Sequence, residues 1–194
     1  MDFSKLIGNQ QVIKSDGNVF LTLKDILPVD GPMKMLIIAK TPAPTSVKVG
    51  HYFQGQQGKM FWNMLKKYNL LTVPLNQFED DNLLSLGYGI TDIVKLPHEY
   101  SKEPTREEYR VGAKRIITLI DRLKPDIVMF VYKKALDNII REFDVNITTD
   151  YGFNPQLDSL FGGKVLVFPM PGTPCTKEQQ IKAMNELVNV ISRK

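Results

Sequence analysis

The sequence predicts a three-layer α/β/α fold around a central, mainly parallel sheet of four strands. Short, continuous apolar runs at residues 33–39, 126–131 and 164–168 are typical of strands that are buried on both faces. Amphipathic helical patterns lie between these runs, as they do in folds with a parallel sheet. The chain of 194 residues is long enough to bury a substantial core.

The first 30 residues are predicted to be an appendix to a single domain formed by residues 31–194. Asp16 and Gly17 lie between apolar stretches, which predicts a hairpin over residues 12–23. The core then begins with the first buried run. After this run, Pro42 and Pro44 predict a loop, because proline is excluded from helix interiors and central strands.

Helices and strands alternate along the rest of the chain. Thr105 and Glu108 have the spacing of a capping box, which predicts the start of a long helix that Pro125 ends. Thr176 and Gln179 have the same spacing before the last helix. The other expected elements are helices at residues 59–68, 78–86 and 133–143, a strand at 90–94 and mostly loop at 151–163.

Two proline-rich loops follow two of the buried runs, one after Ala39 and one after Phe168. Open α/β folds place their ligand sites at the carboxyl ends of parallel strands. We therefore expect the loops at residues 41–46 and 169–175 to meet at one edge of the sheet. Tyr52 or Phe53 is expected to line the same cleft.

Five short motifs occur in a fixed order between residue 24 and the C-terminus. They are Ala39-Lys-Thr-Pro-Ala43, the aromatic stretch at residues 50–65, Gly87-Tyr-Gly-Ile-Thr-Asp-Ile-Val94, Lys124-Pro-Asp-Ile-Val-Met-Phe-Val131 and Phe168-Pro-Met-Pro-Gly-Thr-Pro174. In order and spacing they resemble the uracil-DNA glycosylase superfamily, and especially its mismatch-specific and thymine-DNA glycosylase branch. The resemblance implies a monofunctional DNA glycosylase that flips a damaged or mismatched base from DNA and hydrolyses the N-glycosidic bond without a metal or cofactor.

The resemblance also implies roles for individual residues. Thr41 stands where the branch has the Asn that positions the attacking water, and Met170 stands where the branch usually has Asn. Thr41 cannot act as a carboxylate base and Met170 donates no hydrogen bond, so backbone N–H groups near Gly172 and Thr173 would stabilise the leaving base. The expected base pocket comprises Ala39, Lys40, Pro42, Ala43, Tyr52, Phe53 and Met170.

Other side chains near these motifs are candidates for acid–base chemistry or DNA binding. His51 is a candidate general acid or phosphate contact. Residues 173–175 lie where a wedge would enter DNA, yet none is large and apolar. The expected DNA contacts are Lys48, Lys59, Pro171, Gly172, Thr173 and Pro174.

Composition allows more than one function. A net charge of +4 permits a nucleic-acid partner without requiring one. The single cysteine, Cys175, excludes an intramolecular disulfide, and the lack of long apolar runs predicts a cytoplasmic protein, which we expect to be a monomer. Two alternatives stay open, namely a catalytically inactive nucleic-acid-binding protein and a hydrolase of another small substrate.

Overall fold

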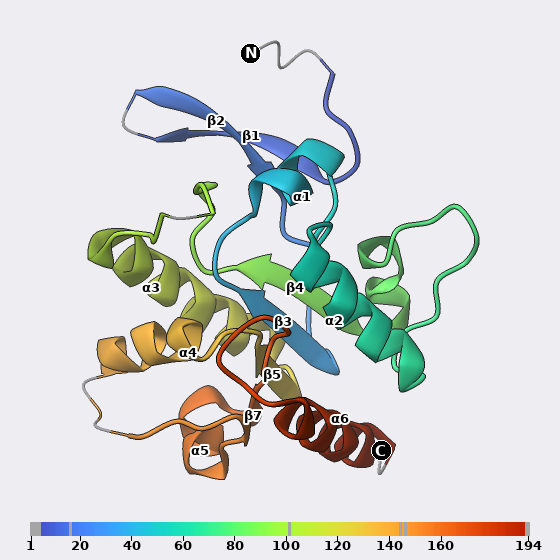
Figure 1. The fold of residues 1–194 in the computed structure, drawn as a ribbon. Helices are drawn as coiled ribbons and strands as arrows, with labels where there is room; N and C mark the ends of the chain where they lie inside the picture. The colour runs from blue at the N-terminus through green and yellow to red at the C-terminus, as the bar shows by residue number, and fades with distance from the viewer. Residues whose placement is uncertain (1–4, 16, 101, 144, 146, 193–194) are drawn as a thin grey trace.

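The computed structural model describes residues 5–15, 17–100, 102–143, 145 and 147–192. A five-stranded sheet in the order β4–β3–β5–β7–β6 forms the middle layer (Figure 1). Four strands are parallel, and the two-residue β6 pairs antiparallel with β7 at one edge. The strands are β3 (Met35–Ala39), β4 (Tyr88–Asp92), β5 (Ile127–Phe130), β6 (Gly152–Phe153) and β7 (Lys164–Val167).

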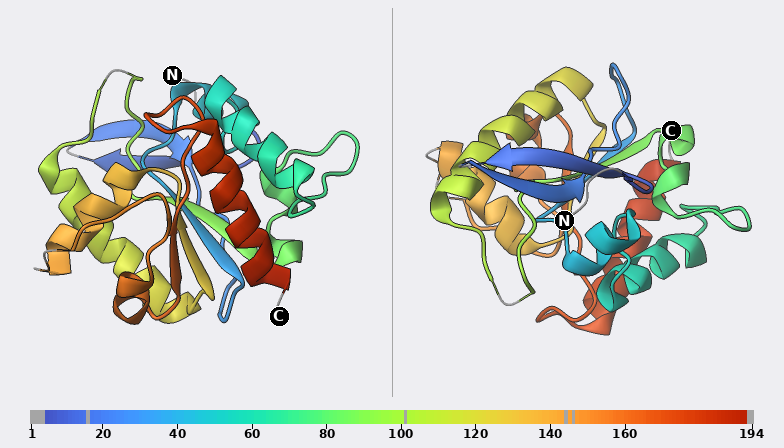
Figure 2. Two further views of the ribbon diagram at one scale, coloured as in Figure 1. Left: turned by 60° about the horizontal axis from the view of Figure 1, so that its bottom comes forward. Right: turned by 90° about the horizontal axis from the view of Figure 1, so that it is seen from above.

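Helices cover both faces of this sheet, which confirms the predicted three layers (Figures 1 and 2). Helices α2 (Gln56–Lys67) and α6 (Lys177–Ser192) pack on one face, where Ile37 and Ala39 of β3 point. Helices α3 (Arg106–Leu123), α4 (Lys133–Ile140) and α5 (Asp158–Phe161) pack on the other, against Leu36 and Ile38. Because alternate side chains enter opposite cores, the central strands β3 and β5 are apolar throughout.

Two of the predicted helix starts are confirmed in atomic detail. The Thr105 hydroxyl accepts a hydrogen bond from the Glu108 N–H at 3.2 Å, and the Thr105 N–H donates to the Glu108 carboxylate at 2.6 Å. Thr176 and Gln179 make the same reciprocal pair at 3.2 and 2.8 Å. Each pair satisfies two backbone donors that the first turn of a helix leaves free.

Three predictions of local structure were wrong. The stretch predicted to be a loop contains helix α1 (Pro44–Val49), because Pro44 occupies the first turn, where its missing N–H is not needed. Residues 78–86 form two 3₁₀ turns, η1 (Asp80–Asn82) and η2 (Leu84–Leu86), instead of one α-helix. The stretch at 151–163, predicted to be mostly loop, holds β6, η4 (Pro155–Leu157) and α5. Another 3₁₀ turn, η3 (Arg141–Phe143), extends α4.

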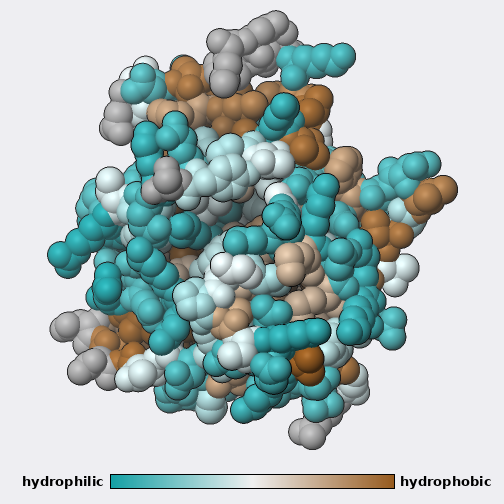
Figure 3. Space-filling model, in the orientation of Figure 1, coloured by the Kyte–Doolittle hydropathy of each residue, from teal (hydrophilic) through white to brown (hydrophobic). Residues whose placement is uncertain are grey.

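The hairpin near the N-terminus is present as a separate two-stranded sheet of β1 (Gln10–Ser15) and β2 (Asn18–Leu23). Gly17 has a φ of 76° in its turn, and Asp16 lies outside the described residues. Leu23 and Ile26 enter the main core beyond it. In Figure 3 apolar side chains gather over this hairpin, while polar ones cover most of the rest of that face. None of the helices among the described residues is both long and apolar enough to cross a bilayer.

Candidate active site

The carboxyl ends of the four parallel strands meet at one edge of the sheet. Both proline-rich loops leave from this edge, because β3 and β7 run parallel on either side of β5. A side chain on Gly172 would collide with the amide of Gln57 in the first turn of α2, so the second loop lies against that helix. The two loops therefore flank a shared region, as the sequence predicts.

A cavity of about 700 Å³ opens in this region, between the β3–α1 loop, the start of α2 and the β4–α3 loop. Its size is typical of sites for small molecules. Among the residues expected in the base pocket, the cavity is lined by Lys40, Thr41, Ala43 and Phe53. Other lining residues are Pro44, Thr45, Ser46, Gln54, Gly55, Gln56, Gln57, Gly58, His98, Glu99, Tyr100, Lys102 and Tyr132.

The Thr41 hydroxyl has a fixed orientation. It donates a hydrogen bond to the Leu96 carbonyl oxygen at 2.5 Å. Two backbone bonds, from Ile93 to Ala39 and from Val94 to the Lys40 carbonyl, hold the two segments together. Since the hydroxyl proton is already used, only the oxygen lone pairs remain to bind a ligand, and they accept hydrogen bonds.

Phe53 borders the cavity as part of an aromatic cluster. Its ring centroid lies 5.3 Å from that of Phe61 and 5.5 Å from that of Trp62. Its backbone has a φ of 56°, a rare conformation for a residue with a side chain. A Cβ on Gly58 would collide with the Phe53 backbone, so a glycine in α2 permits this close approach. Such strained conformations cluster at functional sites.

Lys40 brings a positive charge to the cavity wall. Its Nζ lies 2.9 Å from a carboxylate oxygen of Glu103, which also accepts a hydrogen bond from the Tyr109 hydroxyl at 2.6 Å. Partial burial acts to raise the pKa of Glu103, but the bonds from Tyr109 and Lys40 hold it down to about 2. Glu103 is therefore ionised near neutral pH and fixes the Lys40 side chain.

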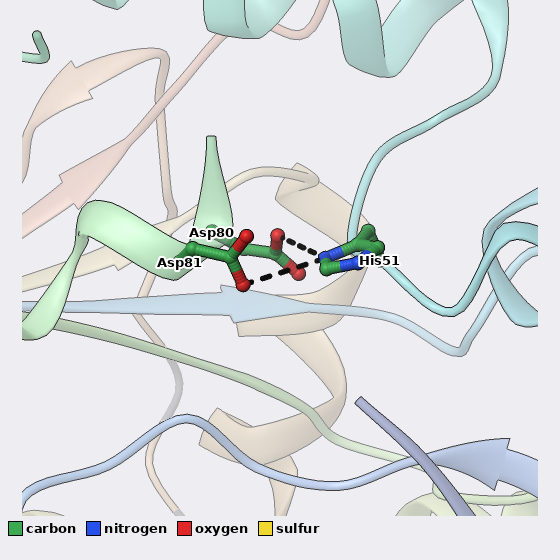
Figure 4. Close-up of side chains that lie close together, drawn as sticks. All are labelled: His51, Asp80 and Asp81. Carbon is green, nitrogen blue, oxygen red and sulfur yellow. Dashed lines mark hydrogen bonds and ion pairs between the residues drawn. The ribbon is translucent and has the colours of Figure 1, made fainter. Parts of the chain in front are cut away.

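His51 does not line the cavity, although the sequence suggests a catalytic role for it. The side chain is 6% exposed, and its ring is stacked 3.7 Å from Phe78. Its Nδ1 lies 2.7 Å from Asp80 Oδ1. Figure 4 shows this contact from the His51 ring to Asp80. The second oxygen of Asp80 accepts hydrogen bonds from the Tyr52 N–H at 2.8 Å and from Asn9 at 3.1 Å. His51 thus belongs to a structural cluster that ties η1 and the N-terminal segment to the domain.

His51, Asp80 and Asp81 bring three metal-binding groups within 4.8 Å of one another (Figure 4). Both oxygens of Asp80 already accept hydrogen bonds, so a metal would have to displace existing partners. We expect EDTA, Zn²⁺ and Mg²⁺ all to leave the thermal unfolding midpoint unchanged, because a ligand that binds only the folded state would raise it. A rise in the midpoint that depends on Zn²⁺ and disappears in His51→Gln would contradict this expectation.

Several other residues expected in the base pocket lie in the core instead. Tyr52 is 1% exposed and its hydroxyl donates to the Lys24 carbonyl at 3.2 Å. Met170 is also 1% exposed and packs in the core formed with α2 and α6. Ala39 and Pro42 are buried and absent from the cavity lining. These side chains support the cavity from behind, because the strand ends and tight loops turn them inward.

The residues expected to bind DNA are more exposed. Lys48 in α1 and Lys59 in α2 are exposed, as are Gly172 and Pro174, whereas Thr173 is half-buried and Pro171 is buried. The Thr173 N–H donates to the Met170 carbonyl at 3.1 Å. That N–H is therefore engaged within the loop, which weakens its expected role in stabilising the leaving base.

The sequence analysis gave no site role to several residues that line the cavity, among them Gln54, His98, Tyr100 and Tyr132. Tyr132 comes almost directly after β5, and His98 and Tyr100 follow β4. The rule that ligand sites lie beyond the carboxyl ends of parallel strands could have identified all but Gln54. We applied this rule only to the two proline-rich loops. Applied to the segments after β4 and β5 as well, the rule predicts that His98, Tyr100 and Tyr132 lie at the cavity.

Asp92 is a buried carboxylate at the same edge of the sheet. It is the last residue of β4, pairs with Ala39 and is 1% exposed. Its Oδ2 has no hydrogen-bond partner among the described residues, and Lys95 Nζ is 3.6 Å from it. Burial raises the pKa of Asp92 to about 6, although Lys95 acts to lower it. Buried carboxylates that lack hydrogen bonds cost stability and are often found at functional sites.

Comparisons with known proteins identify the family of this chain. The family model described as the uracil DNA glycosylase superfamily matches residues 29–180, which include both loops and the described cavity-lining residues. A protein of Schizosaccharomyces pombe named G/U mismatch-specific uracil DNA glycosylase is 28% identical over 103 residues, which cover 52% of this chain. The matched stretch spans 31% of that relative's length. The chain belongs to the uracil DNA glycosylase superfamily.

Proposed function

We propose that this protein is a DNA glycosylase that removes uracil, or another damaged or mismatched base, by hydrolysing the N-glycosidic bond. The observation that carries this proposal is the convergence of Thr41 and Phe53 on one cavity. They come from two motifs that resemble those of the family, and the cavity lies at the carboxyl edge of the sheet. The matching family model and the similar glycosylase support the same class of reaction.

The geometry supports a separate role in the reaction for each of Phe53, Thr41 and Lys40. A base flipped from DNA enters the cavity and stacks on Phe53. The Thr41 oxygen, whose own proton is held by Leu96, accepts a hydrogen bond from a water and orients it toward the sugar. As water attacks C1′, the C–N bond breaks and its electron pair leaves with the base. The attacking water gives up a proton to solvent, and the departing base anion takes one up from solvent. Lys40, held at the cavity wall by Glu103, is proposed to stabilise the negative charge that develops on the base.

DNA is the proposed partner, as a duplex or a single strand. Exposed Lys48 and Lys59 are proposed to contact phosphates, which position DNA without reading its sequence. Binding of this kind weakens steeply as salt concentration rises. The protein is proposed to act as a monomer in the cytoplasm, without a cofactor.

A base-release assay tests the proposal. Labelled duplexes and single strands carrying uracil, hypoxanthine or a G·T mismatch are incubated with protein, and alkali then cleaves the abasic sites. We expect Thr41→Val to lower kcat by up to about 100-fold, because it removes the oxygen that orients water while keeping the shape of the side chain. Thr41→Ser retains the hydroxyl and should retain most activity.

Thr118→Val is the matched control, since the Thr118 hydroxyl also donates to a backbone carbonyl, at 3.1 Å, but on the exposed surface of α3. It should leave base release unchanged. Equal loss in Thr41→Val and Thr118→Val would contradict a specific role for Thr41. Folded protein that binds DNA without releasing any base would favour the alternative of a non-catalytic binding protein.

A further inference from the structure

Tyr100 lies at the mouth of the cavity, on the loop between β4 and α3. It is 71% exposed, which makes it the most exposed aromatic residue in the described part of the chain. Phe78, the next, is 37% exposed. An aromatic ring in this position borders the cavity that the proposed function assigns to the flipped base.

The Tyr100 side chain is exposed but anchored. Its hydroxyl lies 2.5 Å from the Thr45 hydroxyl and accepts a hydrogen bond from the Thr45 N–H at 3.3 Å. On the other side, a Cβ built on Gly55 would lie 3.9 Å from the same oxygen. The Tyr100 side chain therefore extends from the β4–α3 loop to the start of α1, on the other side of the cavity. Anchoring at this end orients the ring while leaving most of it open to solvent.

The opposite loop offers no large apolar side chain at residues 173–175, where a wedge would enter DNA. In the loop at residues 169–175, the Thr173 hydroxyl donates to the Met170 carbonyl at 2.6 Å, and the Cys175 thiol lies 3.5 Å from the same oxygen. These side chains point back into their own loop. Extruding a nucleotide leaves its neighbours unstacked, and proteins that extrude or kink DNA commonly fill such gaps with a large side chain.

The two loops arise on opposite sides of the strands that carry the cavity. In the sheet order β4–β3–β5–β7, the loop bearing Tyr100 follows β4, whereas residues 169–175 follow β7. Both loops extend from the same end of the molecule (Figure 2). An aromatic side chain on the first loop can therefore meet DNA that approaches the cavity, from the side opposite to the expected wedge.

We propose that Tyr100 stacks on a nucleobase adjacent to the extruded nucleotide and so holds the opened DNA at the cavity mouth. This inference rests on the proposed function. Stacking of a base on an aromatic side chain is tolerant of base identity, because every base has a π-face. Tyr100 thus acts as a positioning residue that supports many sequence contexts, and it takes no part in breaking the glycosidic bond.

The test uses a duplex with 2′-fluoro-deoxyuridine, which resists cleavage, beside the fluorescent base 2-aminopurine. Tyr100→Ala should weaken binding by about 5- to 150-fold. It should also brighten the bound 2-aminopurine, since this base fluoresces more when unstacked. Tyr100→Phe loses the hydroxyl anchor but keeps the ring, and it should retain most of the affinity and of the quenched signal. Leu75→Ala removes a 90% exposed apolar side chain outside the cavity lining and should change neither.

The outcomes separate this inference from the proposed function. If the wild type releases uracil and Tyr100→Ala binds with unchanged affinity and fluorescence, the stacking role is wrong while the glycosylase proposal stands. If Tyr100→Phe loses as much as Tyr100→Ala, the hydroxyl anchor is what matters and stacking is again overturned. If the folded wild type neither binds nor cleaves any of these strands, both proposals fail.

Discussion

Asp80→Ala should lower the free energy of unfolding by about 3 kcal/mol or more, because it removes the acceptor for three donors in a dry interior. Asp80 is fully buried, and its carboxylate binds His51, the Tyr52 N–H and Asn9. Alanine would leave the Tyr52 N–H and the His51 ring without these bonds. The bonds from Asp80 hold residues 51–53 in place, and Phe53 in this segment borders the cavity. Because Asp80→Ala removes these bonds, base release should fall as well.

Urea unfolding at neutral pH measures this effect. Asp81→Ala is the matched control, since the neighbouring carboxylate is 42% exposed and lies 3.7 Å from the same His51 nitrogen. It should cost no more than about 1 kcal/mol. Asp80→Asn keeps one acceptor oxygen and should fall between the two. If Asp80→Ala and Asp81→Ala destabilise equally, the cluster does not support the fold in the way described.

Asp92→Asn should stabilise the protein by about 3 kcal/mol above pH 6. Burial raises the pKa of Asp92 from 3.8 to about 6. The folded state therefore holds this proton more tightly than the unfolded state does. Its contribution to stability is complete below pH 3.8, declines as pH rises and is lost above about pH 6. Asparagine has nearly the same shape and carries no charge, so it avoids that loss.

The surroundings of Asp92 set the size of the gain. Lys95 lies 3.6 Å away and Arg115 and Asp25 are nearby, while the Tyr52 hydroxyl is close enough to affect the ionised form. Lys95 and Arg115 also pair with Asp25 at 2.8 and 2.7 Å, so they keep a partner when Asp92 is neutral. In Asp92→Asn, the lost attraction of Lys95 and Arg115 for residue 92 should lower stability by only a little. Removing the buried charge should raise stability by more than that.

Urea unfolding of wild type and Asp92→Asn across pH 4 to 8 gives the difference directly. The two proteins should be nearly equal at pH 4 and diverge as pH rises. Asp121→Asn, an exposed carboxylate in the last turn of α3, should stay within about 0.5 kcal/mol of wild type at every pH. A variant that is less stable than wild type at pH 8 would show that the charge of Asp92 is compensated after all.

Part of this structure was predictable from local patterns. The strands β3, β5 and β7 could be predicted from their own residues, without knowing which strands they pair with. A strand that is covered on both faces is a short, nearly continuous apolar run. The start of α3 followed from Thr105 and Glu108, whose hydrogen bonds join residues three apart. The parallel arrangement of these strands then implied that the loops after Ala39 and Phe168 share an edge.

Other features depend on contacts between residues far apart in the sequence. His51 and Asp80 are joined by a hydrogen bond across 29 positions, and Thr41 and Leu96 across 55. No local pattern distinguishes a histidine beside a cavity from one held by a buried carboxylate. The same is true of Tyr52 and Phe53, adjacent residues of which one enters the core and the other borders the cavity.

The sequence by itself therefore determined the layers, the main strands and helices, and the edge at which the site lies, since periodicity and capping act over a few residues. Only the tertiary structure decided which side chains line the cavity. In the structure His51 and Met170 are buried outside the cavity lining, whereas Tyr100 and Tyr132 line it. The physical reason is that the order of strands in the sheet decides which loops become neighbours, and packing against those neighbours decides where each side chain points.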